Sequence, residues 1–111
     1  MFITRSFFMA NYTWYKLVGN IPAIDNTSGG WFKKNHNKLR LAFDNVDDYE
    51  VITIFLCLSS EDLPKLFEIT LSHKNVPIKT FRIETFASAI AKHQEIVASL
   101  RNTRDNKDYN E

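Results

Sequence analysis

The chain has 111 residues, of which 44% are hydrophobic, so it is long enough for one buried core and too apolar for disorder along its whole length. Its 14 basic and 13 acidic residues give a net charge of +1, which excludes the strong basic excess typical of proteins that bind nucleic acids or anionic membranes. The single cysteine, Cys57, excludes an internal disulfide, and we expect a protein of the reducing cytoplasm.

The N-terminal segment carries a short apolar run. Phe7, Phe8 and Met9 belong to it, and Arg5 interrupts it on the N-terminal side. Secretory signals need a longer uninterrupted run, and no stretch of the chain approaches the roughly 20 apolar residues of a membrane-spanning helix. The sequence therefore predicts neither a signal peptide nor a membrane partner, with either Met1 or Met9 as the start.

The first half of the chain predicts two strands separated by turns and a loop. Residues 12–18 are aromatic and β-branched, which favours a strand, and the Gly-Asn pair at 19–20 ends it. Residues 26–30 contain two glycines and predict a flexible loop. Polar and apolar side chains alternate over residues 38–43, which is typical of a half-buried strand. Residues 44–48 are polar except for Val46 and predict the turn that follows it.

The middle of the chain predicts a buried strand and a hairpin. Residues 51–58 are apolar at nearly every position and rich in β-branched side chains, which predicts a central strand covered on both faces. Residues 67–72 alternate between apolar and polar side chains. A turn at 73–75 then allows residues 76–83 to return as the second arm. Pro77 predicts that this arm lies at a sheet edge, because proline donates no hydrogen bond to a neighbouring strand.

The C-terminal third predicts one amphipathic helix from about Thr85, a good N-cap residue, to about Leu100. Its apolar stripe recurs at spacings of three and four residues. The stripe consists of Phe86, Ile90, His93, Val97 and Leu100. Residues 102–111 contain no aliphatic side chain and are expected to form a frayed polar tail.

These elements predict an α+β fold with a mostly antiparallel sheet of about five to six strands and one C-terminal helix packed on one face. Short connections favour hairpins over parallel crossovers. No repeat or linker divides the chain, so we expect a single domain over residues 1–101, followed by the polar tail at 102–111.

The sequence lacks the motifs of metal, nucleotide and nucleophile sites, with no Cys-x-x-Cys, no His-x-x-x-His and no glycine-rich phosphate loop. Cys57 lies in the most apolar segment, where a thiol packs as a small hydrophobe. His93 falls on the buried stripe of the helix, and we expect it to pack there rather than act as a ligand or a base. We predict no enzyme, no metal and no cofactor.

Charge is segregated along the chain. Residues 31–40 carry four basic and no acidic side chains, whereas residues 44–62 carry six acidic and no basic ones. Segregated charge steers and orients a partner during association. The candidate partner-binding residues are Trp31, Phe32, Lys33, Lys34, His36, Lys38, Arg40, Asp44, Asp47, Asp48 and Glu50.

Three interpretations of residues 31–40 remain open. In the first, Trp31 and Phe32 close the core and the lysines are merely solvated. In the second, the aromatic and basic side chains bind single-stranded nucleic acid. In the third, they anchor a protein interface. The near-neutral net charge favours a protein partner over a nucleic acid.

We therefore expect a non-enzymatic, protein-binding inhibitor whose partner is a toxin or a host factor. The specific expectation is an immunity protein that neutralises a toxin, or an inhibitor carried by a phage or mobile element, because such proteins are often small, motif-poor α+β domains. The alternative is a small single-stranded nucleic-acid-binding protein that uses residues 31–40.

Overall fold

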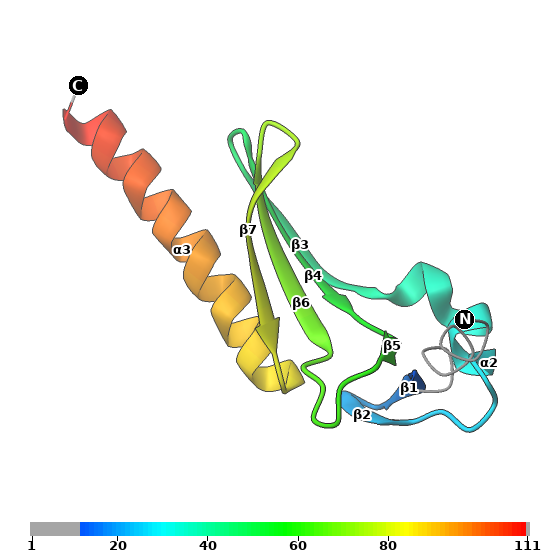
Figure 1. The fold of residues 1–111 in the computed structure, drawn as a ribbon. Helices are drawn as coiled ribbons and strands as arrows, with labels where there is room; N and C mark the ends of the chain where they lie inside the picture. The colour runs from blue at the N-terminus through cyan, green and yellow to red at the C-terminus, as the bar shows by residue number, and fades with distance from the viewer. Residues whose placement is uncertain (1–11, 111) are drawn as a thin grey trace, which may run out of the picture.

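The computed structural model describes the backbone of residues 12–110 and the side chains of residues 12–105, in which seven strands form two antiparallel sheets. The smaller sheet has the order β2-β1-β5 and the larger one β3-β4-β6-β7 (Figure 1). The strands are β1 (Thr13–Val18), β2 (Ile21–Ile24), β3 (Arg40–Val46), β4 (Tyr49–Phe55), β5 (Leu58–Ser59), β6 (Phe67–His73) and β7 (Val76–Ile83). The helices are α2 (Gly30–Asn35), the 3-10 helix η1 (His36–Lys38) and α3 (Phe86–Asn110).

The α+β class and the C-terminal helix on one face of an antiparallel sheet are confirmed, with slightly more strands than predicted and with two sheets instead of one. The short helical segment formed by α2 and η1 was not predicted. The N-terminal segment with Met9 lies outside the described residues.

Within the described residues, the larger sheet is covered by a long helix on one face only. Val51, Thr53 and Phe55 of β4 point toward α3 and are buried, as the alternation of side chains along a strand requires. Ile52 and Ile54 point to the other face and are half-buried. The sequence analysis expected both faces of this strand to be covered, but the only long helix among the described residues packs on one side (Figure 1).

The apolar run 51–58 is divided between the two sheets. β4 ends at Phe55, and the Leu56 N–H then donates to the Leu66 carbonyl at 2.7 Å. The Cys57 carbonyl accepts from the Tyr15 N–H at 2.6 Å, and β5 continues as a partner of β1. One uninterrupted strand was predicted here. The chain instead changes partner at Leu56, so its second half belongs to the smaller sheet.

The β7 strand is an edge strand, as Pro77 predicts. The register between β6 and β7 shifts between Leu71 and Ser72, and this irregularity lies opposite the start of β7. A proline and a bulge both discourage pairing with another chain at an exposed edge.

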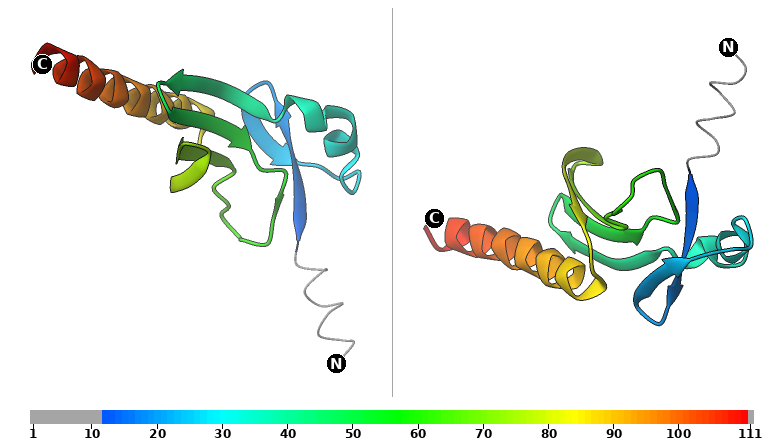
Figure 2. Two further views of the ribbon diagram at one scale, coloured as in Figure 1. Left: turned by 90° about the horizontal axis from the view of Figure 1, so that it is seen from above. Right: turned by 60° about the horizontal axis from the view of Figure 1, so that its bottom comes forward.

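The α3 helix begins as predicted and ends later. Thr85 caps it, because its hydroxyl accepts from the Ser88 N–H at 3.1 Å. Ala89, His93 and Val97 are its buried residues and pack on the larger sheet. The helix continues past Leu100 to Asn110 and runs beyond the sheet (Figure 2). The backbone of the segment expected to be a frayed tail is therefore helical through Asn110.

Two hydrophobic clusters form the core. One contains Phe55, Cys57, Leu66, Phe67 and Ala89, and side chains from both sheets and from α2 pack against it. The other joins the far half of the larger sheet to α3 through Val46, Val51, Ile69 and Val97. The first cluster therefore holds α2 and the smaller sheet against the larger sheet.

Candidate binding surface

The loop before α2 is ordered by the carboxylate of Asp25, which is 6% exposed. Its Oδ1 accepts from the backbone N–H of Thr27 at 3.0 Å and from the Thr27 hydroxyl. Its Oδ2 accepts from the Trp31 N–H at 3.2 Å, at the first turn of α2. These hydrogen bonds, with that of the Thr27 hydroxyl foremost, lower the pKa of Asp25 below its usual 3.8. The loop expected to be flexible is thus fixed by one buried carboxylate.

Gly29 is required where the loop enters α2. Its φ of +89° is in the left-handed region, which side chains disfavour. A Cβ at this position would also lie 2.9 Å from Cε2 of Trp14. The glycine therefore lets the indole of Trp14 pack directly against the loop, which brings β1 close to α2.

The two aromatic residues of α2 pack on the core. The Trp31 ring meets Phe55 edge-on with 5.8 Å between centroids, and the Phe32 ring lies 5.7 Å from that of Trp14. Both Trp31 and Phe32 are half-buried. On their inner sides, Trp31 and Phe32 therefore close the core, as the first of the three interpretations expects. Their outer sides remain accessible to solvent.

The basic side chains of the same segment are all exposed. We call Lys33, Lys34, Lys38 and Arg40 the basic surface. None of the four forms an ion pair with any residue whose side chain the structure describes. The Arg40 guanidinium lies 5.0 Å from the centroid of the Phe43 ring, a cation–π contact on the uncovered face of the larger sheet. His36 is exposed as well, with its ring 6.1 Å from Phe32.

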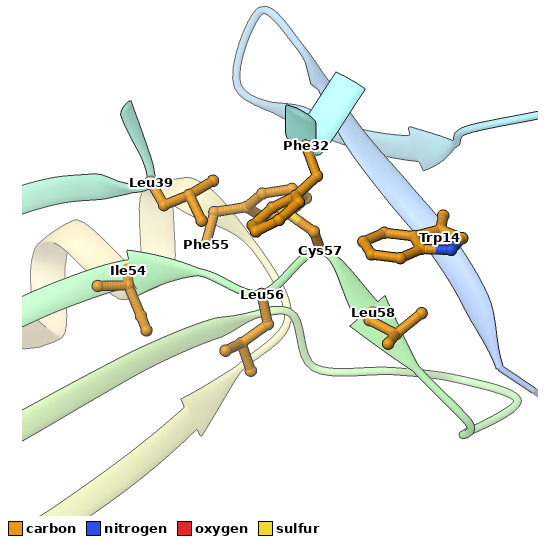
Figure 3. A pocket seen from close by; sticks show the side chains of 8 residues that line it. All are labelled: Trp14, Phe32, Leu39, Ile54, Phe55, Leu56, Cys57 and Leu58. Carbon is orange, nitrogen blue, oxygen red and sulfur yellow. The ribbon is translucent and has the colours of Figure 1, made fainter. Parts of the chain in front are cut away.

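An apolar groove of about 300 Å³ opens where α2, β1 and the 54–58 segment meet (Figure 3). Figure 3 shows Trp14 and Leu58 at one side, Leu39 and Ile54 at the other, and the Phe32 ring between them. We call this feature the apolar groove. It is lined by Trp14, Phe32, Leu39, Ile54, Phe55, Leu56, Cys57 and Leu58.

Cys57 contributes apolar surface to the groove rather than a reactive thiol. The side chain is buried, and this burial raises its pKa from 9.0 to about 11, with a smaller contribution from the negative charge of Asp25. The thiolate is the nucleophilic form, and at neutral pH it is scarce at such a pKa. The expectation that Cys57 packs as a small hydrophobe agrees with this environment.

The predicted acidic residues lie away from the basic surface. Asp47 and Asp48 are exposed in the turn between β3 and β4, at the opposite end of β3 from Arg40 (Figure 1). Arg40 and Asp47 are seven positions apart along extended chain, a span of roughly 20 Å. Asp44 and Glu50 are half-buried. The structure therefore brings Trp31, Phe32 and the basic surface together but does not join them to the acidic turn.

Asp44 belongs to a chain of hydrogen bonds that leads into the core. Its Oδ2 lies 2.7 Å from Nε2 of His93, and Nδ1 of His93 lies 2.8 Å from the Thr53 hydroxyl. An ionised carboxylate only accepts, so Nε2–H donates to Asp44 and the Thr53 hydroxyl donates to Nδ1 in the neutral imidazole. His93 is 2% exposed, and both of its ring nitrogens are satisfied.

This chain has the residue types of a hydrolase triad but not the accessibility. In a triad the nucleophilic hydroxyl must face the substrate, with the carboxylate on the far side of the imidazole. Here the Thr53 hydroxyl group lies on a residue that is 0% exposed, whereas the side chain of Asp44 is 41% exposed. The arrangement joins β3, β4 and α3 and presents no nucleophile.

Comparisons with known proteins found no matching family model, curated protein or solved structure. The residues themselves therefore carry the functional argument. Among residues 12–105, no group of three or more His, Cys, Asp or Glu side chains is placed to hold a metal ion. None of the helices in the described part of the chain is long and apolar enough to span a membrane.

Sequence reasoning missed most of the groove. Trp14, Leu39, Ile54 and Leu58 were assigned only to strands, and their contribution to a shared opening depends on the meeting of two sheets. One signal was present in the sequence. The apolar run 51–58 has apolar residues on both faces, and the face that α3 leaves uncovered supplies Ile54 to the groove.

Proposed function

We propose that this chain is a non-enzymatic, protein-binding domain whose interface is the basic surface together with the apolar groove. The observation that carries the proposal is the exposure of four basic side chains beside an open apolar lining. Protein interfaces combine a desolvated apolar centre with a polar rim, and charges on the rim steer the encounter.

The environments of the reactive residue types support a binding function over catalysis. The Thr53 hydroxyl is buried, and the pKa of Cys57 is raised to about 11. A catalytic nucleophile needs access to its substrate and an activated form near neutral pH. Neither residue offers both.

The packing of the aromatic rings favours a protein partner over single-stranded nucleic acid. Binders of single strands stack successive bases on exposed ring faces. Here the Trp31 ring meets Phe55 edge-on, and the Phe32 ring contacts Trp14. The rings are therefore engaged in the protein's own packing. Nucleic-acid binding through residues 31–40 remains the alternative that the experiment must separate.

The narrower expectation, an immunity protein or an inhibitor from a phage or mobile element, rests on analogy between small α+β proteins. For the proposal, this analogy matters only because it names the expected partner, which is a toxin or a host factor. A search for partners should therefore include secreted toxins and host defence proteins.

The test reverses charge at the interface and elsewhere. Lys34→Glu with Lys38→Glu changes the basic surface, and Lys74→Glu with Lys79→Glu makes the same change in net charge on the β6–β7 hairpin. All four side chains are exposed, so each change should alter stability by at most about 0.5 kcal/mol. Both variants and the wild type serve as affinity bait in nuclease-treated extract of the source organism.

We expect a protein that the wild type and the hairpin variant retain but the interface variant loses. The association rate of the purified pair should fall about tenfold or more at low salt in the interface variant, because charge steering acts on the encounter. Gel-shift assays with a labelled single-stranded oligonucleotide at two salt concentrations test the alternative. Equal retention by all three baits, or oligonucleotide binding that only the interface variant loses, would contradict the proposal.

A further inference from the structure

The apolar groove is shaped for a side chain rather than for a free small molecule. Sites for small organic ligands measure about 300–1,000 Å³ and carry a few placed polar groups. The groove, at about 300 Å³, lies at the lower limit, and its lining side chains are apolar apart from the thiol of Cys57 and the indole N–H of Trp14. One bulky apolar side chain from a protein can enter such a site.

Basic charge lies along one wall of the groove. Leu39, which lines the groove, stands between Lys38 and Arg40 in the chain. Arg40 is also the cross-strand partner of Ile54, another lining residue. Residues directly opposite each other in an antiparallel pair project from the same face, so the Arg40 side chain starts beside the groove.

The acidic side chains near the groove do not neutralise this wall. Glu68 lies opposite Ile54 on the β6 side, but it forms an ion pair with Arg82 at 2.6 Å. Residues 61–62, Glu and Asp, lie in the connection that follows β5 and are not among the residues that line the groove. The groove therefore has a basic wall that takes part in none of the ion pairs among the described side chains, and such a wall orients an acidic partner segment.

We infer that the apolar groove is the anchor site for a partner-protein segment in which a bulky apolar side chain stands beside acidic residues. The apolar side chain enters the groove, and the carboxylates face Lys38 and Arg40. This inference rests on the proposed function, because it names the partner chemistry for the same surface. Buried aromatic anchors of this kind carry a large share of interface affinity.

The probe is a short synthetic peptide with one Phe flanked by Glu residues. A second peptide replaces Phe with Ala, and a third replaces each Glu with Gln. The chain holds two tryptophans, so Trp31→Phe leaves Trp14, a groove residue, as the only indole reporter. Fluorescence titration and calorimetry then measure the affinity for each peptide.

We expect the Phe peptide to bind about 30-fold or more tightly than the Ala peptide, the difference that removal of a hot-spot anchor makes. The Gln peptide should bind more weakly than the Phe peptide with Glu residues, and its affinity should depend much less on salt concentration. Leu58→Ser should weaken binding of the Phe peptide and leave the Ala peptide unchanged. Leu63→Ser makes the same change at another exposed leucine outside the groove and should have no effect.

Three results would overturn the inference. Equal affinity for the Phe and Ala peptides would show that the groove is not the anchor, although binding at the basic surface would leave the proposed function standing. Failure of every peptide to bind at about 1 mM and low salt would show that the segment chemistry is wrong. Tighter binding of a single-stranded oligonucleotide, lost on reversal of Lys34 and Lys38, would overturn both the inference and the proposed function.

Discussion

The substitution His93→Leu tests whether the buried imidazole holds the core together through its hydrogen bonds. From the sequence, this change is expected to be neutral or stabilising, because an apolar residue would replace a polar one on a buried stripe. The structure reverses that expectation. His93 forms a hydrogen bond with the hydroxyl of Thr53, a residue that is 0% exposed. It forms a second one with Asp44 of the edge strand β3.

The magnitude follows from the exposure of the two partners. Removing the imidazole leaves the Thr53 hydroxyl buried without a partner, which costs about 1–3 kcal/mol. Asp44 loses less, because its side chain is 41% exposed and water can replace the lost donor. The larger apolar surface of leucine offsets part of this cost. We expect His93→Leu to lower the free energy of unfolding by about 1–3 kcal/mol.

A double-mutant cycle separates the hydrogen bond from packing. Thr53→Val removes the hydroxyl with little change of shape and leaves Nδ1 of His93 unsatisfied, so it should also destabilise. With both changes present, no polar group remains unpaired at this contact, and such replacements are close to neutral. Urea unfolding should therefore show that the double variant loses less stability than the sum of the single variants, by about 1 kcal/mol or more.

Gln94→Leu is the matched control, since it introduces the same residue at the next, exposed position of α3 and should change stability by at most about 0.5 kcal/mol. If the stability losses of His93→Leu and Thr53→Val simply added in the double variant, the predicted coupling between the two side chains would be refuted. An unchanged or raised stability in His93→Leu alone would show that the imidazole only fills space.

Two further predictions concern the loop that positions α2. Gly29→Ala should lower the free energy of unfolding in urea by about 1–3 kcal/mol more than Gly19→Ala does. Both glycines have a positive φ, but only at Gly29 would a Cβ meet a side chain, that of Trp14. Equal losses in the two variants would contradict this close contact. Asp25 has a pKa lowered below 3.8 in the folded state, so its contribution to stability is present above that pH and is lost as the pH falls through the folded-state pKa. The stability gap between wild type and Asp25→Asn should therefore narrow below about pH 4, and a constant gap would show that ionisation of Asp25 does not contribute.

The candidate site was only partly readable from the sequence. The basic, aromatic character of residues 31–40 is a local property, so the exposure of its lysines could be anticipated, whereas the inward packing of Trp31 was one of three open interpretations. The acidic character of residues 44–48 was equally visible, but residues 44–46 belong to β3 and only 47–48 form the turn, whose separation from Arg40 depends on the direction of β3. The positions of charged residues in the sequence do not determine the distances between them in the folded protein.

What the sequence by itself determined is the set of local patterns. Alternation along residues 67–72, the proline at 77 and the three- and four-residue spacing from Phe86 to Leu100 each depend on neighbours in the chain, and each yields the element it predicts.

The tertiary structure decided the contacts between distant residues. His93 meets Asp44 and Thr53 only because α3 crosses β3 and β4. The apolar groove likewise forms only because the chain leaves the larger sheet after Phe55 and joins β1, which brings Trp14 and Leu58 opposite Leu39 and Ile54. Periodicity fixes which face of an element is apolar, whereas packing between elements decides which side chains that face meets.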